Sequence, residues 1–212
     1  MFLRKIATAL AMVGAVGTSL AAQTDDRALD NGALDIAFVF NGTNHSFDQS
    51  TVLDVAQITS HFRPGSDCAG PCLAPDTAAN GVQTIGERGV INFVANQVAR
   101  GAGLLIDSRT AADRSSGFIT ASVNIPTALL QPENTFLTDI LQAMGAQFLD
   151  GSLTFSDALP VVIFDDGPST TDAHTLITTL INLGYPAKKI SYYRGGMLVW
   201  TALGLNTQDA KS

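Results

Sequence analysis

A buried strand that runs directly into a polar loop and a helix, residues 159–173 (LPVVIFDDGPSTTDA), constrains the fold of this chain most. Val161–Phe164 is a run of β-branched and aromatic residues after a proline, and Asp-Asp-Gly-Pro ends it, which is typical of a strand followed by a tight turn. The hydroxyl residues Ser169, Thr170 and Thr171 then offer a helix N-cap, and residues 173–183 are apolar at helical spacing. In open α/β sheets, ligands bind beyond the carboxyl ends of strands, where helix N-termini present free N–H groups. The residues of a ligand-binding loop are therefore expected to be Asp165, Asp166, Gly167, Ser169, Thr170 and Thr171.

Strand and helix patterns alternate along the chain on both sides of this segment. Further strands are predicted at 104–106, 121–125 and 189–193, and further helices at 84–100, 136–144 and 197–203. Such alternation indicates parallel strands joined by right-handed crossovers. We expect one α/β domain over residues 84–207, followed by a short tail at 208–212.

The first residues are typical of a bacterial secretory signal. Arg4 and Lys5 give a positive start, residues 6–16 are a short apolar run, and residues 19–21 (Ser-Leu-Ala) have the small residues that a signal peptidase requires. A membrane anchor is the alternative, but a spanning helix needs about 20 strongly apolar residues. We expect residues 1–22 to be removed and the mature protein to be periplasmic or secreted, without membrane attachment.

Residues 23–83 are interpreted as an N-terminal arm that packs on the main domain. Residues 34–40 predict a strand that ends in a turn at Asn41-Gly42, and residues 51–62 fit either a strand or a short helix. Cys68 and Cys72 flank Ala-Gly-Pro in the loop that follows. Outside the reducing cytosol, this spacing favours a small disulfide.

Two other functions of this cysteine pair stay open. One is a redox pair that cycles between thiol and disulfide, although the Cys-x-x-Cys spacing of disulfide exchange is missed by one residue. The other is a metal site with His61, which matches no standard zinc spacing. No metal and no cofactor is expected.

The charge of the chain excludes several partners. The formal net charge is −7, and cleavage of the signal removes two positive charges and no negative ones, which leaves −9. A chain this acidic is not attracted to nucleic acid or to an anionic membrane face.

Four landmarks in order resemble the rhodanese-like domain family. They are Leu-Leu-Ile-Asp-Ser-Arg at 104–109, Gly-Phe-Ile-Thr-Ala-Ser-Val-Asn-Ile-Pro at 117–126, the Val161–Phe164 strand with its loop, and the pair Leu-Gly-Tyr at 183–185 with Tyr-Arg-Gly-Gly-Met-Leu-Val-Trp at 193–200. The resemblance implies an open parallel sheet of about five strands with helices on both faces, and it does not extend to the arm. It also implies that Asp107 and Arg109 hold the fold together.

In that family a cysteine after the central strand takes up a sulfane sulfur as a persulfide, and N–H groups of the loop hold the negative sulfur. In this chain Asp165 stands at the cysteine position, Thr170 at that of a loop arginine, and Phe118 where histidine is frequent. An aspartate has no sulfur to carry, and Asp166 and Asp172 add like charge that opposes an anion. Thiosulfate, persulfide and phosphate chemistry are therefore disfavoured, and no catalytic residue is assigned.

Four side chains in or near the loop are candidates for its chemistry. Paired carboxylates such as Asp165 and Asp166 can serve as general acid and base, as a nucleophile or as cation ligands, or they can be a solvated turn left after loss of the catalytic residue. Arg194 is expected to pair with a loop aspartate, and His174 is near enough in sequence to reach the loop. Apart from the alternative of a metal site with Cys68 and Cys72, His61 has no assigned role.

The sequence thus favours an exported rhodanese-like pseudoenzyme that binds a protein partner or a small ligand. The alternatives are a hydrolase or cation-dependent enzyme that uses Asp165 and Asp166, and a thiol-disulfide function at Cys68 and Cys72.

Overall fold

The computed structural model describes residues 35–62, 73–149 and 152–209. Its strands are β1 (Asp35–Phe40), β2 (Thr43–Asp48), β3 (Gln83–Ile85), β4 (Leu104–Asp107), β5 (Ser122–Asn124), β6 (Gln147–Leu149), β7 (Ser152–Thr154), β8 (Val161–Phe164) and β9 (Ile190–Tyr193). Its α-helices are α1 (Val55–Ser60), α2 (Glu87–Asn96), α3 (Ala111–Arg114), α4 (Leu137–Ala143), α5 (Asp172–Asn182) and α6 (Gly196–Ala202). Short 3₁₀ turns lie at η2 (Val98–Arg100), η3 (Thr127–Leu130) and η4 (Ala187–Lys189).

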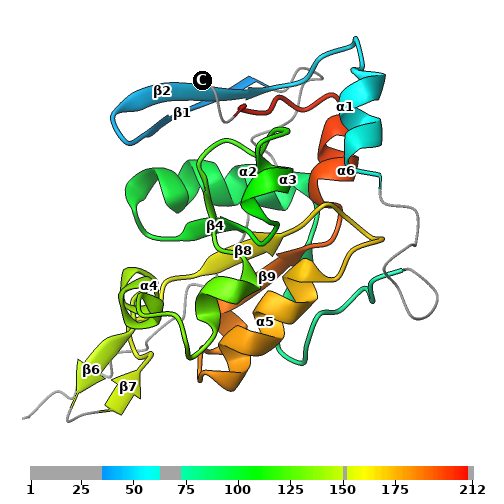
Figure 1. Cartoon of the computed structure of the whole chain (residues 1–212). Coiled ribbons are helices and arrows are strands. Elements are labelled where there is room, and N and C mark those ends of the chain that lie inside the picture. The colour runs from blue at the N-terminus through cyan, green and yellow to red at the C-terminus, as the bar shows by residue number, and fades with distance from the viewer. Residues whose placement is uncertain (1–34, 63–72, 150–151, 210–212) are drawn as a thin grey trace, which may run out of the picture.

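A five-stranded parallel sheet forms the centre of the molecule. The strand order is β3-β9-β8-β4-β5, and every neighbouring pair runs parallel. Strand β8 lies in the middle, and all four of its residues are buried, which explains why this segment reads as a continuous apolar run. The predicted α/β class and the expected sheet of about five strands are confirmed (Figure 1).

Helices cover both faces of the sheet, as expected (Figure 1). Alternate residues of β8 point to opposite faces. Ile163 packs in one core with residues of α4 and α5, such as Leu176, and Phe164 packs in a second core with residues of α2 and α6, such as Trp200. The first of these cores lies under α5 and the second under α6, so the loop that joins β8 to α5 starts between the two layers.

Because both faces of the sheet are covered, neighbouring residues of β9 such as Tyr192 and Tyr193 are both buried. Strand alternation predicts that one of them faces inward and the other outward, but both are fully buried. They do point to opposite faces, since Tyr192 belongs to the α5 core and Tyr193 to the α6 core. The prediction of an outward tyrosine was wrong because helices cover this sheet on both sides.

Part of the arm is a β-hairpin that packs on the α6 side of the sheet. Strand β1 pairs with β2 in antiparallel register, and the ring of Phe47 meets Trp200 edge to face at 5.4 Å. Residues 51–62, left open between strand and helix, contain α1, which packs against α6.

Four strands were not expected. Strand β2 has one buried residue, Phe47, among polar ones, and β3 stands where a helix start was predicted. The antiparallel pair β6–β7 lies in a segment expected to be only connecting structure. No helix in the described residues is long and apolar enough to span a membrane.

Candidate functional site

The loop after β8 is built around the carboxylate of Asp165. Its Oδ1 accepts a hydrogen bond from the Gly167 N–H at 2.9 Å, and its Oδ2 accepts one from the Ala173 N–H at 3.0 Å. Ala173 lies in the first turn of α5, so Asp165 caps this helix across the loop. Thr171 occupies the N-cap position but makes no side-chain cap bond, because the stronger carboxylate acceptor already reaches the helix start.

The environment of Asp165 favours its neutral form. The residue is fully buried, and burial raises the pKa of its carboxyl to about 7, although the hydrogen bonds from Ala173, Thr170 and Gly167 work in the opposite direction. The negative charge of Asp172 adds to the rise. A carboxyl with a pKa near neutrality can give or take a proton at physiological pH.

Backbone N–H groups of α6 donate hydrogen bonds to carbonyls of the loop. The Met197 N–H donates to the Asp165 carbonyl at 3.0 Å, and the Leu198 N–H donates to the Asp166 carbonyl at 2.9 Å. A Cβ added to Gly196 would lie 2.5 Å from the Asp165 carbonyl oxygen. Gly196 therefore permits the close backbone approach that fixes the loop on the helix.

The remaining loop residues are used within the loop or lie at its edge. Thr170 Oγ1 donates to the Gly167 carbonyl at 2.9 Å and accepts from the Gly167 N–H at 3.2 Å. Ser169 is half-buried and Thr171 is exposed. The Gly167 N–H is thus shared between Asp165 and Thr170, and it does not point to an empty site.

Asp166 binds a residue of the arm that the sequence left without a role. His61 Nδ1 lies 3.0 Å from Asp166 Oδ1, and Arg109 Nη1 donates to the same oxygen at 3.0 Å. All three side chains are almost fully buried. His61 Nε2 is also buried and has no hydrogen-bond partner among the described residues. Nothing in the sequence indicated this contact, because 105 residues separate its two partners.

Arg109 joins this pair to the structural centre of the domain. Its Nε and Nη2 donate to the two oxygens of Asp107 at 2.9 and 2.8 Å, in the bidentate geometry that guanidinium groups favour. Its Nη2 also donates to the Gly117 carbonyl at 2.8 Å. Arg114 adds a second cation to Asp107 at 3.0 Å. The expected pairing of Asp107 with Arg109 is present, and it extends to Asp166.

The two loop carboxylates differ in their ionisation. Burial acts to raise the pKa of Asp166, but the hydrogen bond from His61 and the charge and hydrogen bond of Arg109 outweigh it and hold the pKa below its usual range. The pKa of Asp165 is shifted in the opposite direction. The arrangement therefore holds an ionised carboxylate, Asp166, beside a carboxyl, Asp165, that gains or loses its proton near pH 7.

The arm contacts the loop at a second point, on the other side of residues 63–72. The Ala74 N–H donates to the Pro168 carbonyl at 2.6 Å, and Arg194 donates to the Ala74 carbonyl at 2.9 and 3.1 Å. Arg194 also pairs with Asp76 at 3.3 Å. The prediction that Arg194 pairs with a loop aspartate was wrong, because segment 74–76 of the arm lies beside it and supplies both acceptors.

His174 is half-buried at the start of α5. Its ring meets Tyr192 edge to face at 4.9 Å, and its Nε2 is buried without a hydrogen-bond partner among the described residues. Burial lowers the pKa of His174.

Cys68 and Cys72 lie outside the described residues, so their disulfide stays a prediction. Within residues 35–62, 73–149 and 152–209, no group of three or more His, Cys, Asp or Glu side chains is arranged to hold a metal ion.

Solved structures that resemble this chain share little sequence with it. The BH2092 protein of Bacillus halodurans is 13% identical and matches 60% of this chain and 77% of its own, with a TM-score of 0.43. A possible tyrosine phosphatase from Rhodopseudomonas palustris is 15% identical over 62% of this chain and 88% of its own, with a TM-score of 0.43. The rhodanese-like domain of the Alr3790 protein from Anabaena is 20% identical over 51% of this chain and 66% of its own, with a TM-score of 0.35.

No curated protein matches the chain significantly. The family model of the rhodanese-like domain does match the chain. The match covers residues 92–203, which is more than half of the length of this chain. This range contains β4, β8, the loop at Asp165 and α6. The chain belongs to the rhodanese-like domain family.

Proposed function

We propose that this protein is a rhodanese-like binding or accessory module without sulfurtransferase activity. One observation carries the proposal: the N–H groups of Gly167 and Ala173 already bind the carboxylate of the chain's own Asp165. A sulfurtransferase needs a sulfur nucleophile at the end of the central strand and free donors to hold the sulfur anion. Here an oxygen acid stands at that position and uses those donors.

The charges around the loop support the same conclusion. Asp165 is fully buried and Asp166 nearly so, and the guanidinium of Arg109 is committed to Asp107 and Asp166. The positive charge of Arg109 is therefore already neutralised by two carboxylates, and the loop is not expected to attract thiosulfate or phosphate. A partner or ligand is more readily recognised through the arm that covers the loop than through the loop itself.

We also propose that the protein is exported from a bacterial cell. The amino-terminal pattern of residues 1–22 supports cleavage by a signal peptidase, and the mature charge of −9 argues against nucleic acid and anionic membrane surfaces as partners.

The proposal predicts no turnover when the purified mature protein is given thiosulfate and cyanide. Asp165→Cys is the matched gain-of-function variant. Its thiolate can attack the outer sulfur of thiosulfate, so that the S–S bond breaks, sulfite leaves and a cysteine persulfide forms. We expect the variant to gain the mass of one sulfur atom at residue 165, because the Gly167 and Ala173 N–H groups are then free to hold the persulfide anion.

Asp172→Cys, on the exposed start of α5, controls for a thiol outside the cradle and is expected not to form this persulfide. Peptide mapping separates residue 165 from Cys68 and Cys72. Clear sulfur transfer by the wild-type protein would contradict the proposal, whatever the variants do.

A second candidate is hydrolysis by acid–base catalysis. The opposite pKa shifts of Asp165 and Asp166 are the pattern that separates an acid from a base in one site. It takes second place because both oxygens of Asp165 already accept the N–H groups of Gly167 and Ala173, and Asp166 is bound by His61 and Arg109. Including p-nitrophenyl phosphate and acetate in the same assays, with Asp165→Cys as the comparison, tests this candidate. The thiol-disulfide alternative stays a prediction, because Cys68 and Cys72 lie outside the described residues.

A further inference from the structure

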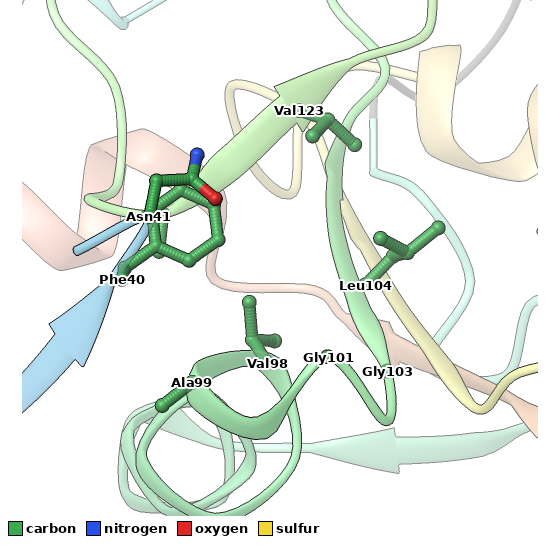
Figure 2. A pocket seen from close by; sticks show the side chains of 9 residues that line it. Phe40, Asn41, Val98, Ala99, Gly101, Gly103, Leu104 and Val123 are labelled. Atoms are coloured by element: carbon green, nitrogen blue, oxygen red, sulfur yellow. The ribbon is translucent and has the colours of Figure 1, made fainter. Parts of the chain in front are cut away.

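A pocket of about 350 Å³ lies at the edge of the sheet opposite to the Asp165 loop. It opens beside the start of β4, whereas the loop follows the carboxyl end of the parallel strand β8. The turn of the β1–β2 hairpin forms one wall, and η2 with the first residues of β4 forms the other (Figure 2). The two sites are therefore separated by the length of the strands.

The lining of the pocket is mainly apolar, and Asn41 contributes its one polar side chain. Phe40, Val98, Leu104 and Val123 supply most of the wall, and the carboxamide of Asn41 lies at its rim (Figure 2). None of the nine lining residues is charged. A mainly apolar cavity with few polar groups, in this size range, is the usual form of a small-molecule site.

The pocket exists because the arm packs on the domain. The family match covers residues 92–203, which contribute η2, β4 and β5 to the pocket. Phe40 and Asn41 come from the hairpin, which lies outside that match. The pocket is thus a feature that this chain adds to the family scaffold, and it does not repeat the family's site.

The backbone beside the pocket is strained at one residue. Gly101 has φ +68° because it is the C-cap of η2, and a Cβ added there would meet no atom within 4 Å, so the space in front of it is open. Ala121 has φ +65°, a left-handed conformation that costs an alanine about 1–2 kcal/mol. Strain of this kind is concentrated at ligand clamps and other functional sites. Asn41 is also left-handed, but the Asn-Gly turn of the hairpin accounts for it.

We propose that this pocket binds a neutral, mainly apolar small molecule, such as an aromatic compound that carries one carbonyl or hydroxyl group. An ion is excluded as the ligand because its burial among Val98, Leu104 and Val123 would leave its charge unpaired. An anion is further opposed by the acidic charge of the whole chain. The amide of Asn41 can donate to a carbonyl or accept from a hydroxyl, which fixes the orientation of the ligand.

The test uses N-phenyl-1-naphthylamine, a neutral aromatic probe whose fluorescence rises in apolar surroundings, with the purified mature protein. We expect saturable binding at one site. In ¹H–¹⁵N spectra of the wild type, the probe should shift the backbone amides of Gly101, Gly103 and Asn41. This mapping needs no variant, so it decides the question even if a pocket substitution fails to fold.

Val123→Trp fills the pocket and is expected to weaken probe binding at least tenfold. Val52→Trp is the matched control, because Val52 is 81% exposed on the surface near α1 and away from the pocket, and its affinity should equal that of the wild type. The proposal fails if the wild type shows no saturable binding up to the solubility of the probe. It also fails if the amide shifts cluster at Val52, Leu53 and Val55 and leave the glycines unchanged.

Discussion

The carboxylate of Asp165 bonds N–H groups at both ends of its loop, in Gly167 and in the first turn of α5. It thereby supplies from within the chain the hydrogen-bond acceptor that the free N–H groups of a helix N-terminus require. The cost is the burial of an acid, which appears as the raised pKa of Asp165. The stability of the fold is therefore expected to depend on the protonation of Asp165.

The raised pKa of Asp165 predicts that the protein becomes less stable as the pH rises. The folded pKa of Asp165, about 7, lies above the value of about 3.9 for an unfolded aspartate. A group raised in this way contributes stability that is fully present below the unfolded pKa and is lost as pH rises through the folded pKa. The free energy of unfolding should therefore fall between about pH 4 and pH 7, by at most about 1.4 kcal/mol per pH unit from this group.

Urea unfolding of wild type and Asp165→Asn across this range measures the effect, since asparagine does not titrate and its profile should be flatter. Asp139→Asn, at an exposed residue of α4, is the control and should keep the wild-type slope. Asp166 has a lowered pKa, so its contribution is lost only below the unfolded value and falls outside this window. Equal slopes for Asp165→Asn and the wild type would refute the assignment.

At the scale of elements, the arm closes over the Asp165 loop from two sides. His61 follows α1 and binds Asp166, and Ala74, beyond residues 63–72, binds Pro168. The His61 side chain is the buried, charge-assisted contact of the two. We infer that it is the main anchor of the arm on the loop.

His61→Ala should release the arm locally without unfolding the sheet. Loss of a buried hydrogen bond to a carboxylate costs about 1–3 kcal/mol, and about 1.4 kcal/mol corresponds to a factor of ten in an opening equilibrium. Hydrogen exchange should therefore accelerate roughly tenfold or more at the amides of Ala74 and Ile58, and change little in β8.

His45→Ala is the matched control, because this histidine lies in the hairpin and packs on Phe38, and it should leave the Ala74 amide protected. Uniform acceleration throughout β8 would show that His61 supports the global fold and does not act as a local anchor.

Prediction from sequence succeeded where a single local signal dominates. Val161–Phe164 was predicted with its correct bounds, because a central parallel strand is apolar throughout. Strand β3 was missed because its three residues, Gln-Thr-Ile, are too few to show a period and only pairing with β9 makes them a strand. The polar segment Thr43–Asp48 was missed as a strand for a related reason, since only Phe47 is buried.

The candidate site was predicted in part. The loop after β8 and the position of Asp165 follow from the strand-loop-helix pattern and from the family landmarks. The contact of His61 with Asp166 does not, because it depends on how the arm folds back over a domain that begins many residues later. The cap on α5 was also assigned to the nearest hydroxyls, although the carboxylate of Asp165 supplies it. Sequence patterns indicate hydrogen bonds between residues that are close in the chain. In the folded protein, partners from more distant positions make these bonds instead.

At the scale of the whole molecule, the hairpin and the sheet share one core. Phe38 and Phe47 belong to the same buried cluster as Val162, Phe164 and Trp200. The hairpin therefore does not stand as a separate unit, and a two-stranded hairpin alone is at best marginally stable in water. The segment that matches the family depends on residues outside the match to cover its α6 face.

This shared core predicts that one substitution in the hairpin destabilises the entire chain. Phe47 is fully buried and packs on Trp200, and truncation of a buried phenylalanine to alanine costs about 3–5 kcal/mol. Phe47→Ala should lower the free energy of unfolding by this amount in a single transition, followed both by fluorescence of Trp200, the one tryptophan of the chain, and by far-ultraviolet circular dichroism. Phe148→Ala is the control, because Phe148 is 52% exposed on β6, and its effect should be small. If the Phe47 variant instead melts in two steps, with the sheet retaining its wild-type midpoint, then the hairpin is a separate unit and the domain is stable without it.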